Sequence, residues 1–268
     1  MHFVNQIRLI AAASAALLVH DLCLAETVVG FARDAATQRF LYTEVHEFNR
    51  APDGKVLTAQ SRYHDDQGRE IARKSLDYRA NRFIPLYKLE VPAQRYAEGI
   101  RSNADPVVVF KQNGEQEEVK SLAREAGLVA ADSGFNHLLM DQLPRLLQGE
   151  TVNFRLIVAG QTDSFRFRAR QVGETTFEQT PAVKLRVEPD SLLRLLVDPL
   201  ELVYDRQGTR LISYRGVSNI IDPRTQQVYK QVVITYGGPV PPEAVDQMPG
   251  CLADRHDVVD LHPLGLTD

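Results

Sequence analysis

The sequence predicts a mostly β protein whose curved antiparallel sheet forms a half-open, clam-like β-barrel with two or three short helices. Alternate residues of Val152–Val158 are apolar, which is the pattern of a strand with one buried and one wet face. Turn residues such as Asp222-Pro223 separate successive strand patterns. Few segments have the three-and-four spacing of a helix, so we expect sheet to dominate.

Residues 1–25 predict a cleaved signal peptide. Arg8 precedes an apolar stretch from Leu9 to Val19, and Cys23-Leu24-Ala25 places small residues where a signal peptidase cleaves. The stretch is shorter than the roughly 20 residues that span a bilayer. Cys23 also lacks the small preceding residues that lipidation needs. We therefore expect export to the periplasm and release of a soluble protein that begins at Glu26.

Composition and charge argue against several classes of protein. The formal net charge is −4, without the basic face that a nucleic-acid partner demands. Cys23 leaves with the signal peptide, so Cys251 has no partner for an internal disulfide. We expect the mature chain to fold around a core, as one β-rich domain over 26–238 followed by a Pro-rich tail over 239–268.

The expected strands form two sets. The clearest alternation lies in the second half of the chain, and the first half is noisier. Residues 80–103, which contain Pro85 and Pro92, show no pattern that predicts their conformation. The expected strands are 27–34, 40–50, 55–64, 69–79, 106–112, 152–158, 165–170, 183–188, 200–205, 209–216 and 226–236.

Two helices are expected. The first spans 134–147, where apolar residues recur at helical spacing; Asp132 or Ser133 would cap it, and Pro144 would kink or split it. The second spans 191–197 and stops before Pro199. This second segment is apolar on nearly every side, so it needs cover on most faces.

No catalytic residue, metal site or cofactor is predicted. Gly216-Val217-Ser218-Asn219 lacks the second glycine of a nucleophile elbow. His64-Asp65-Asp66 lies in an expected hairpin, where Asp serves the turn. The tail contains Cys251, His256 and His262, but their spacing matches no closed zinc site. The basic and aromatic residues within 79–96 are interrupted by acidic ones, which indicates an exposed amphipathic segment rather than a nucleic-acid surface.

One segment resembles a known group of proteins. Residues Tyr204-Asp205, then 210–220 and Asp222, with the closing strand Val232–Tyr236, resemble a pattern in uncharacterised periplasmic β-proteins of Gram-negative bacteria. Those look related in architecture to the outer-membrane lipoprotein carrier and receptor. That fold is a curved antiparallel sheet like an open clam, with helices that plug its mouth. This chain differs from a carrier in having no tryptophan and an additional Pro-rich tail.

These observations lead to a functional hypothesis. A curved sheet with one wet face and few helices either packs solid or keeps an apolar interior that holds a ligand. We expect a non-enzymatic periplasmic protein that binds a lipid, an acyl-chain-like ligand or a lipidated partner. The alternatives are an envelope scaffold with a solid core, whose tail or 80–103 segment docks on another envelope protein, and a hydrolase of an envelope polymer. The residues expected to contact the ligand are Phe154, Leu156, Phe165, Phe167, Leu192, Leu193 and Leu196.

Overall fold

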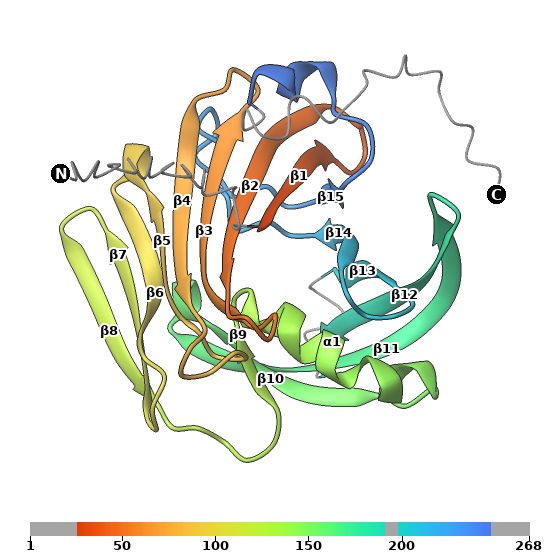
Figure 1. The fold of residues 1–268 in the computed structure, drawn as a ribbon. Coiled ribbons are helices and arrows are strands. Elements are labelled where there is room, and N and C mark those ends of the chain that lie inside the picture. The colour runs from red at the N-terminus through yellow and green to blue at the C-terminus, as the bar shows by residue number, and fades with distance from the viewer. Residues whose placement is uncertain (1–25, 191–197, 248–268) are drawn as a thin grey trace, which may run out of the picture.

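The structure is a computed structural model that describes residues 26–190 and 198–247. The predicted signal peptide at 1–25, the predicted helix at 191–197 and the tail from 248 to 268 lie outside the described residues. In the part of the chain that is described, fifteen strands form one sheet (Figure 1). The strands are β1 (Glu26–Asp34), β2 (Phe40–Arg50), β3 (Val56–Asp65), β4 (Glu70–Asp77), β5 (Leu86–Val91), β6 (Tyr96–Ser102), β7 (Val107–Asn113), β8 (Gln116–Leu122), β9 (Val129–Ala131), β10 (Val152–Val158), β11 (Asp163–Phe177), β12 (Thr180–Pro189), β13 (Leu200–Asp205), β14 (Leu211–Gly216) and β15 (Val232–Tyr236).

The sheet consists of two antiparallel meanders joined edge to edge. Strands β1 to β8 form the first meander, β10 to β15 form the second, and β1 pairs with β15 to join them. β9 then pairs in parallel with β10 at one end of the sheet. The predicted turns account for such meanders: Gly68 takes a positive φ of 74° and donates its N–H to the carbonyl of Asp65.

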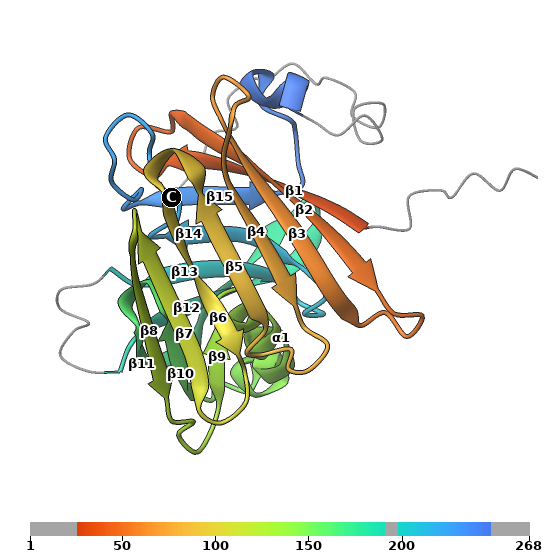
Figure 2. The ribbon, with the colours of Figure 1, turned by 90° about the vertical axis from the view of Figure 1, so that its left-hand side faces the viewer.

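The sheet curls so that its two halves face each other without closing into a barrel (Figures 1 and 2). A 3₁₀ turn after β10, η2 (Ala159–Gln161), contacts β6 and β7. Next to it, Thr162 donates a hydrogen bond of 2.6 Å to Glu118 on β8. The strand order nevertheless ends at β8 and at β9, which do not pair with each other. The prediction of a curved, half-open antiparallel sheet is therefore confirmed.

One α-helix, α1 (Gly134–Leu147), lies inside the curve of the sheet (Figure 1). Its apolar face packs against β9, β10 and β11. The predicted range is confirmed, and the helix is continuous through Pro144, so the predicted split does not occur. Ser133 occupies the N-cap position but makes no capping bond, because its hydroxyl donates to Asp132 instead. The buried helix residues are Gly134, Phe135, Leu138, Leu139, Leu143 and Leu146.

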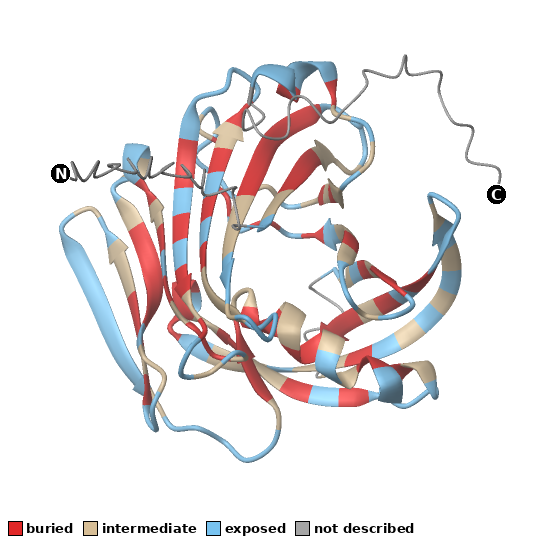
Figure 3. Cartoon of the chain, in the orientation of Figure 1, coloured by how far each residue is buried: buried red, intermediate tan, exposed pale blue. Residues whose placement is uncertain are grey.

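The outer face of the sheet is covered in one place and exposed in others (Figure 3). The 3₁₀ helix η4 (Pro242–Gln247) packs on β1 and β2, where fully buried Ala244 belongs to the same hydrophobic cluster as Phe31 and Val45. The first part of the predicted tail thus lies against the domain. β8 is exposed along almost its whole length and is rich in charged residues, which protects an edge strand from pairing with other chains.

The segment 79–96 corrects one sequence interpretation. It is not an exposed amphipathic segment, because β5 and β6 lie within the sheet and Tyr87 and Leu89 are buried. The charged neighbours Lys88 and Glu90 point to the opposite side, where they form an ion pair. The alternation of buried and charged residues begins only at residue 86. The prolines on either side of this strand, Pro85 and Pro92, obscure the alternation in the sequence. The last predicted strand, 226–236, is shorter than expected and begins at Val232.

We predict that Gly134→Ala destabilises the protein, although alanine favours helices over glycine by about 1 kcal/mol. A Cβ at residue 134 would lie 2.2 Å from the carbonyl oxygen of Phe83, so the backbone would have to move. Such overpacking costs about 1–3 kcal/mol. Gly173→Ala is the matched control, because nothing lies within 4 Å of the place that its new Cβ would occupy. Urea unfolding monitored by circular dichroism measures both; equal stability for Gly134→Ala and wild type would contradict this packing.

Candidate functional site

A large cavity opens inside the curve of the sheet. Its volume is about 1380 Å³, above the usual range of roughly 300–1,000 Å³ for small-molecule sites. Strands β2 to β6 supply its floor, and α1 with β10, β11, β13 and β14 supplies much of its wall. Six of the nine tyrosines of the chain line it, so hydroxyl groups are concentrated at this surface. Apolar residues that line it include Phe48, Ala59, Leu76, Phe135, Met140, Leu156, Phe167, Leu200, Leu202, Leu211 and Ile234.

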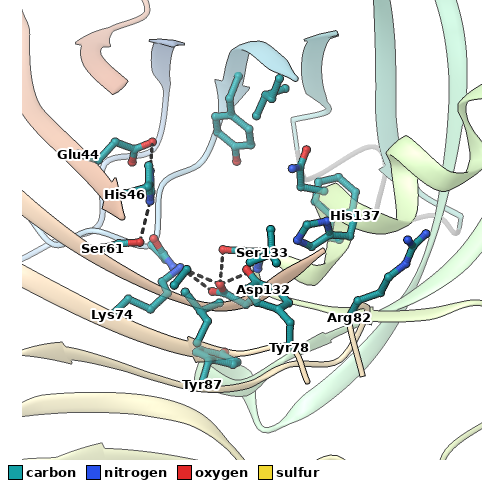
Figure 4. Close-up of a pocket in the computed structure, with 18 of the residues that line it drawn as sticks. Glu44, His46, Ser61, Lys74, Tyr78, Arg82, Tyr87, Asp132, Ser133 and His137 are labelled. Atoms are coloured by element: carbon teal, nitrogen blue, oxygen red, sulfur yellow. Dashed lines mark hydrogen bonds and ion pairs between the residues drawn. The ribbon is translucent and has the colours of Figure 1, made fainter. Parts of the chain in front are cut away.

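A buried ion pair crosses the floor of the cavity (Figure 4). Lys74 Nζ on β4 lies 2.8 Å from both carboxylate oxygens of Asp132, which precedes α1. Both side chains are 6% exposed. Burial alone would raise the pKa of Asp132, but the charge and hydrogen bonds of Lys74, with those of Ser133, hold that pKa below its ordinary value. Burial would likewise lower the pKa of Lys74, and the charge of Asp132 outweighs it and raises that pKa.

A second polar chain runs beside this ion pair. His46 Nδ1 lies 2.7 Å from Ser61 Oγ, and His46 Nε2 lies 3.1 Å from Glu44 Oε1. Tyr236 donates a hydrogen bond of 2.5 Å to the same carboxylate oxygen. Burial would raise the pKa of Glu44, but the charge and hydrogen bond of His46, with the hydroxyl of Tyr236, bring that pKa below its ordinary value. Glu44 is therefore a buried carboxylate on the inner face of β2.

The strand register explains why these side chains meet. His46 on β2 pairs with Ser61 on β3, and Ser61 pairs with Lys74 on β4. Residues directly opposite each other across antiparallel strands share one face, with Cβ atoms about 4.5–5.5 Å apart. Gly30 on β1 pairs with both Glu44 and Tyr236. A Cβ at Gly30 would lie within 3 Å of both side chains, so the missing side chain leaves room for their hydrogen bond.

Two further groups complete the polar lining. Burial raises the pKa of Glu98 on β6, and the hydroxyls of Tyr96 and Tyr87 hydrogen-bond to its carboxyl group. On α1, burial and the nearby arginine charges lower the pKa of His137 to about 4, so its imidazole is neutral at pH 7. Its ring packs edge-on against Tyr78 at 4.9 Å between centroids. The polar groups of the cavity are thus mostly satisfied within the protein.

The residues predicted to contact a ligand are placed as follows. Leu156 and Phe167 line the cavity, and Phe154 is buried in the core beneath α1, stacked between Phe135 and Phe167. Phe165, which pairs with Leu156, is half-buried and is not part of the cavity lining. Leu192, Leu193 and Leu196 lie outside the described residues.

Sequence reasoning missed the polar residues of the floor. Ser61 stands between Ala59 and Tyr63 on the inner face of β3, and Lys74 stands between Ala72 and Leu76 on β4. A lysine or serine at an inward position of an alternating strand is the signal that would have found them. The hairpin expected at residues 64–66 agrees with the structure, because Asp65 accepts hydrogen bonds from the turn that follows it.

The described residues hold no candidate metal centre. They contain no group of three or more metal-ligating side chains, and the histidines and cysteine of the tail lie outside them. Within the same ranges, no helix is long and apolar enough to span a membrane.

The fold and site define a class of protein: a curved-sheet β protein whose cavity has a polar floor and largely apolar walls. No protein-family model matches the chain, and no curated protein matches it. One solved structure that it resembles is a β-barrel-like protein of the domain of unknown function DUF1849 from Brucella abortus. The match covers 80% of this chain and 96% of that one, with 8% sequence identity and a TM-score of 0.47. Similarity at this level carries no information about ligand or activity.

We predict that Lys74→Met destabilises the protein by about 3–5 kcal/mol, because it leaves the carboxylate of Asp132 buried and unpaired. Adding Asp132→Asn, which removes that charge, should restore part of the loss. Lys88→Met is the control, since Lys88 forms only an exposed pair with Glu90 and should change stability by about 1 kcal/mol or less. Urea unfolding of the four proteins measures these differences.

The ion pair between Lys74 and Asp132 predicts that the stability of the protein depends on pH. The pKa of Asp132 is lower in the folded than in the unfolded protein, so its contribution to stability is complete above the unfolded pKa of about 4. It is lost as the pH falls through the lower folded pKa. The stability difference between wild type and the double variant should therefore be constant near neutral pH and change below about pH 4. A difference that stays flat through the acid range would contradict a charged Asp132.

Proposed function

We propose that the protein binds an amphiphilic ligand with an acyl chain, or a lipidated partner, inside this cavity. The observation that carries the proposal is the cavity itself, about 1380 Å³ with apolar side chains on its walls and polar groups at its floor. An acyl chain would occupy the apolar part, and a hydrogen-bonding head would face the polar groups. Burial of each methylene contributes about 0.8 kcal/mol, so a long chain binds usefully without a charged anchor.

The cavity favours binding over the scaffold alternative. A scaffold with a solid core would need the interior of the curve to be filled by side chains, whereas α1 covers only part of it. In the scaffold alternative, deletion of residues 239–268 would abolish capture of a partner. In the binding proposal, the same deletion leaves ligand uptake largely intact, although loss of Ala244 would uncover the outer face of β1 and β2.

Location and partner class form part of the same proposal. The signal-peptide pattern at residues 1–25 supports action in the periplasm, where lipids and lipidated proteins are available. The resemblance of residues 204–236 to periplasmic β-proteins of the lipoprotein-carrier architecture also supports a lipid-like ligand. The expectation that the protein is not an enzyme remains a prediction, and turnover of the ligand is not part of this proposal.

We predict that affinity for straight-chain ligands rises about fourfold with each added methylene until the cavity is filled. Displacement of a fluorescent fatty acid by a series of chain lengths measures this. Leu156→Glu should weaken binding by on the order of tenfold or more, because it places a carboxylate on an apolar wall.

Val119→Glu is the matched control, because Val119 is half exposed on β8, away from the cavity. Thermal unfolding must show that both variants fold. The binding proposal is wrong if no chain length displaces the probe from the wild type, or if Leu156→Glu and Val119→Glu bind alike.

A further inference from the structure

Ser61, His46 and Glu44 contact one another in a row on the cavity floor. Their order is that of a nucleophile, a base and a group that orients the base. Ser61 Oγ is within hydrogen-bond distance of His46, and the other ring nitrogen of His46 faces Glu44. Such a chain is recognised by geometry and role, since catalytic triads occur in different chain orders and on unrelated folds. Here adjacent strands supply it, with Glu44 and His46 two residues apart on one face of β2.

One tautomer of a neutral imidazole fits both contacts of the His46 ring. A carboxylate only accepts hydrogen bonds, so His46 Nε2 carries the proton that faces Glu44. His46 Nδ1 is then an acceptor, and the Ser61 hydroxyl donates to it. This is the state in which imidazole can remove the proton of the serine hydroxyl. In many serine hydrolases the histidine Nε2 faces the serine, whereas here His46 Nδ1 does. Either ring nitrogen can accept the proton of the serine hydroxyl.

The surroundings of the chain favour the same role. Ser61 and His46 both line the cavity, so an ester bound there would reach the hydroxyl. Lys74, the register partner of Ser61, lies on the adjacent strand, where its charge is paired with Asp132. Tyr236 donates to Glu44 and so helps to hold the carboxylate that orients His46.

From this geometry we propose that Ser61 and His46 hydrolyse an ester bond of an acyl ligand held in the cavity, with Glu44 as a positioning residue. The inference rests on the proposed acyl-chain ligand and adds a chemical step to it. It also opposes the sequence-based expectation that the protein is not an enzyme. That expectation relied on the lack of a local motif, and a site assembled by strand register leaves no such motif.

The reaction balances with water as the only co-reactant. Ser61 Oγ bonds to the carbonyl carbon of the ester, its proton moves to His46 Nδ1, and the carbonyl electron pair moves onto oxygen. Collapse of this adduct breaks the bond to the alcohol oxygen, which takes the proton from His46 and leaves as the free alcohol. Water, deprotonated by His46 Nδ1, then attacks the carbonyl carbon of the acyl-serine. The bond from that carbon to Ser61 Oγ breaks, His46 returns the proton to Ser61 Oγ, and the carboxylic acid leaves.

The test combines covalent labelling with turnover on the full mature chain. A long-chain alkyl fluorophosphonate should add to Ser61, shown by the mass of the intact protein and of the peptide that contains residue 61. A p-nitrophenyl ester of the same chain length should be hydrolysed, and Ser61→Ala should lower that rate on the order of a thousandfold or more. Ser75→Ala is the matched control, because Ser75 lies on the exposed face of β4 and should leave both readouts unchanged.

Glu44→Gln tests the positioning role. It should lower kcat on the order of a hundredfold or more with little change in KM, because it alters the imidazole and leaves the chain-binding walls intact. Displacement of the fluorescent fatty acid, measured on each variant, separates the two proposals. Wild type that binds the fatty acid but neither labels nor turns over the ester overturns the hydrolytic site and leaves the binding function standing. Hydrolysis that survives Ser61→Ala overturns the assignment of Ser61, and absence of any binding overturns the proposed function itself.

Discussion

The buried ion pair between Lys74 and Asp132 is the interaction on which the rest of the structure depends. It joins β4 to the residue just before α1, across 58 positions of sequence. Both side chains are almost fully buried, where an isolated charge would be costly and a close pair with further hydrogen bonds is tolerated. The pair therefore joins the meander β1–β8 to the start of the helix.

The position of α1 leaves a cavity among the described residues. The helix packs its apolar face on β9, β10 and β11 and forms a core there with Leu185 and Tyr204. A second core contains Leu41, Tyr63 and Leu89 of β2, β3 and β5. The cavity lies among residues of both cores, and its floor carries charges and hydroxyls that pair with one another. The same groups would meet a ligand that reached the floor.

How far the sequence predicts this arrangement depends on the range of the interaction. Local patterns predict the strands 40–50, 152–158 and 200–205 and the helix 134–147 almost to the residue, because the period of two or 3.6 is decided within each segment. The row of His46, Ser61 and Lys74 depends on the register of three strands, which no single segment contains. The link to Asp132 needs the curl of the whole sheet. Of the predicted ligand contacts, Leu156 and Phe167 line the cavity. The direction of their side chains follows from the alternation within each strand, which is local. Whether a cavity exists depends on the global fold.

We propose that the interior of the curve holds an acyl-chain ligand. Native mass spectrometry of the mature protein, purified under mild conditions from the cell envelope of a host that exports it, tests this most directly. We expect a bound species with the mass of a lipid or fatty acyl compound, which organic extraction releases and which Leu156→Glu largely loses. Protein that is ligand-free as purified, and that takes up no lipid when mixed with an envelope lipid extract, would contradict it.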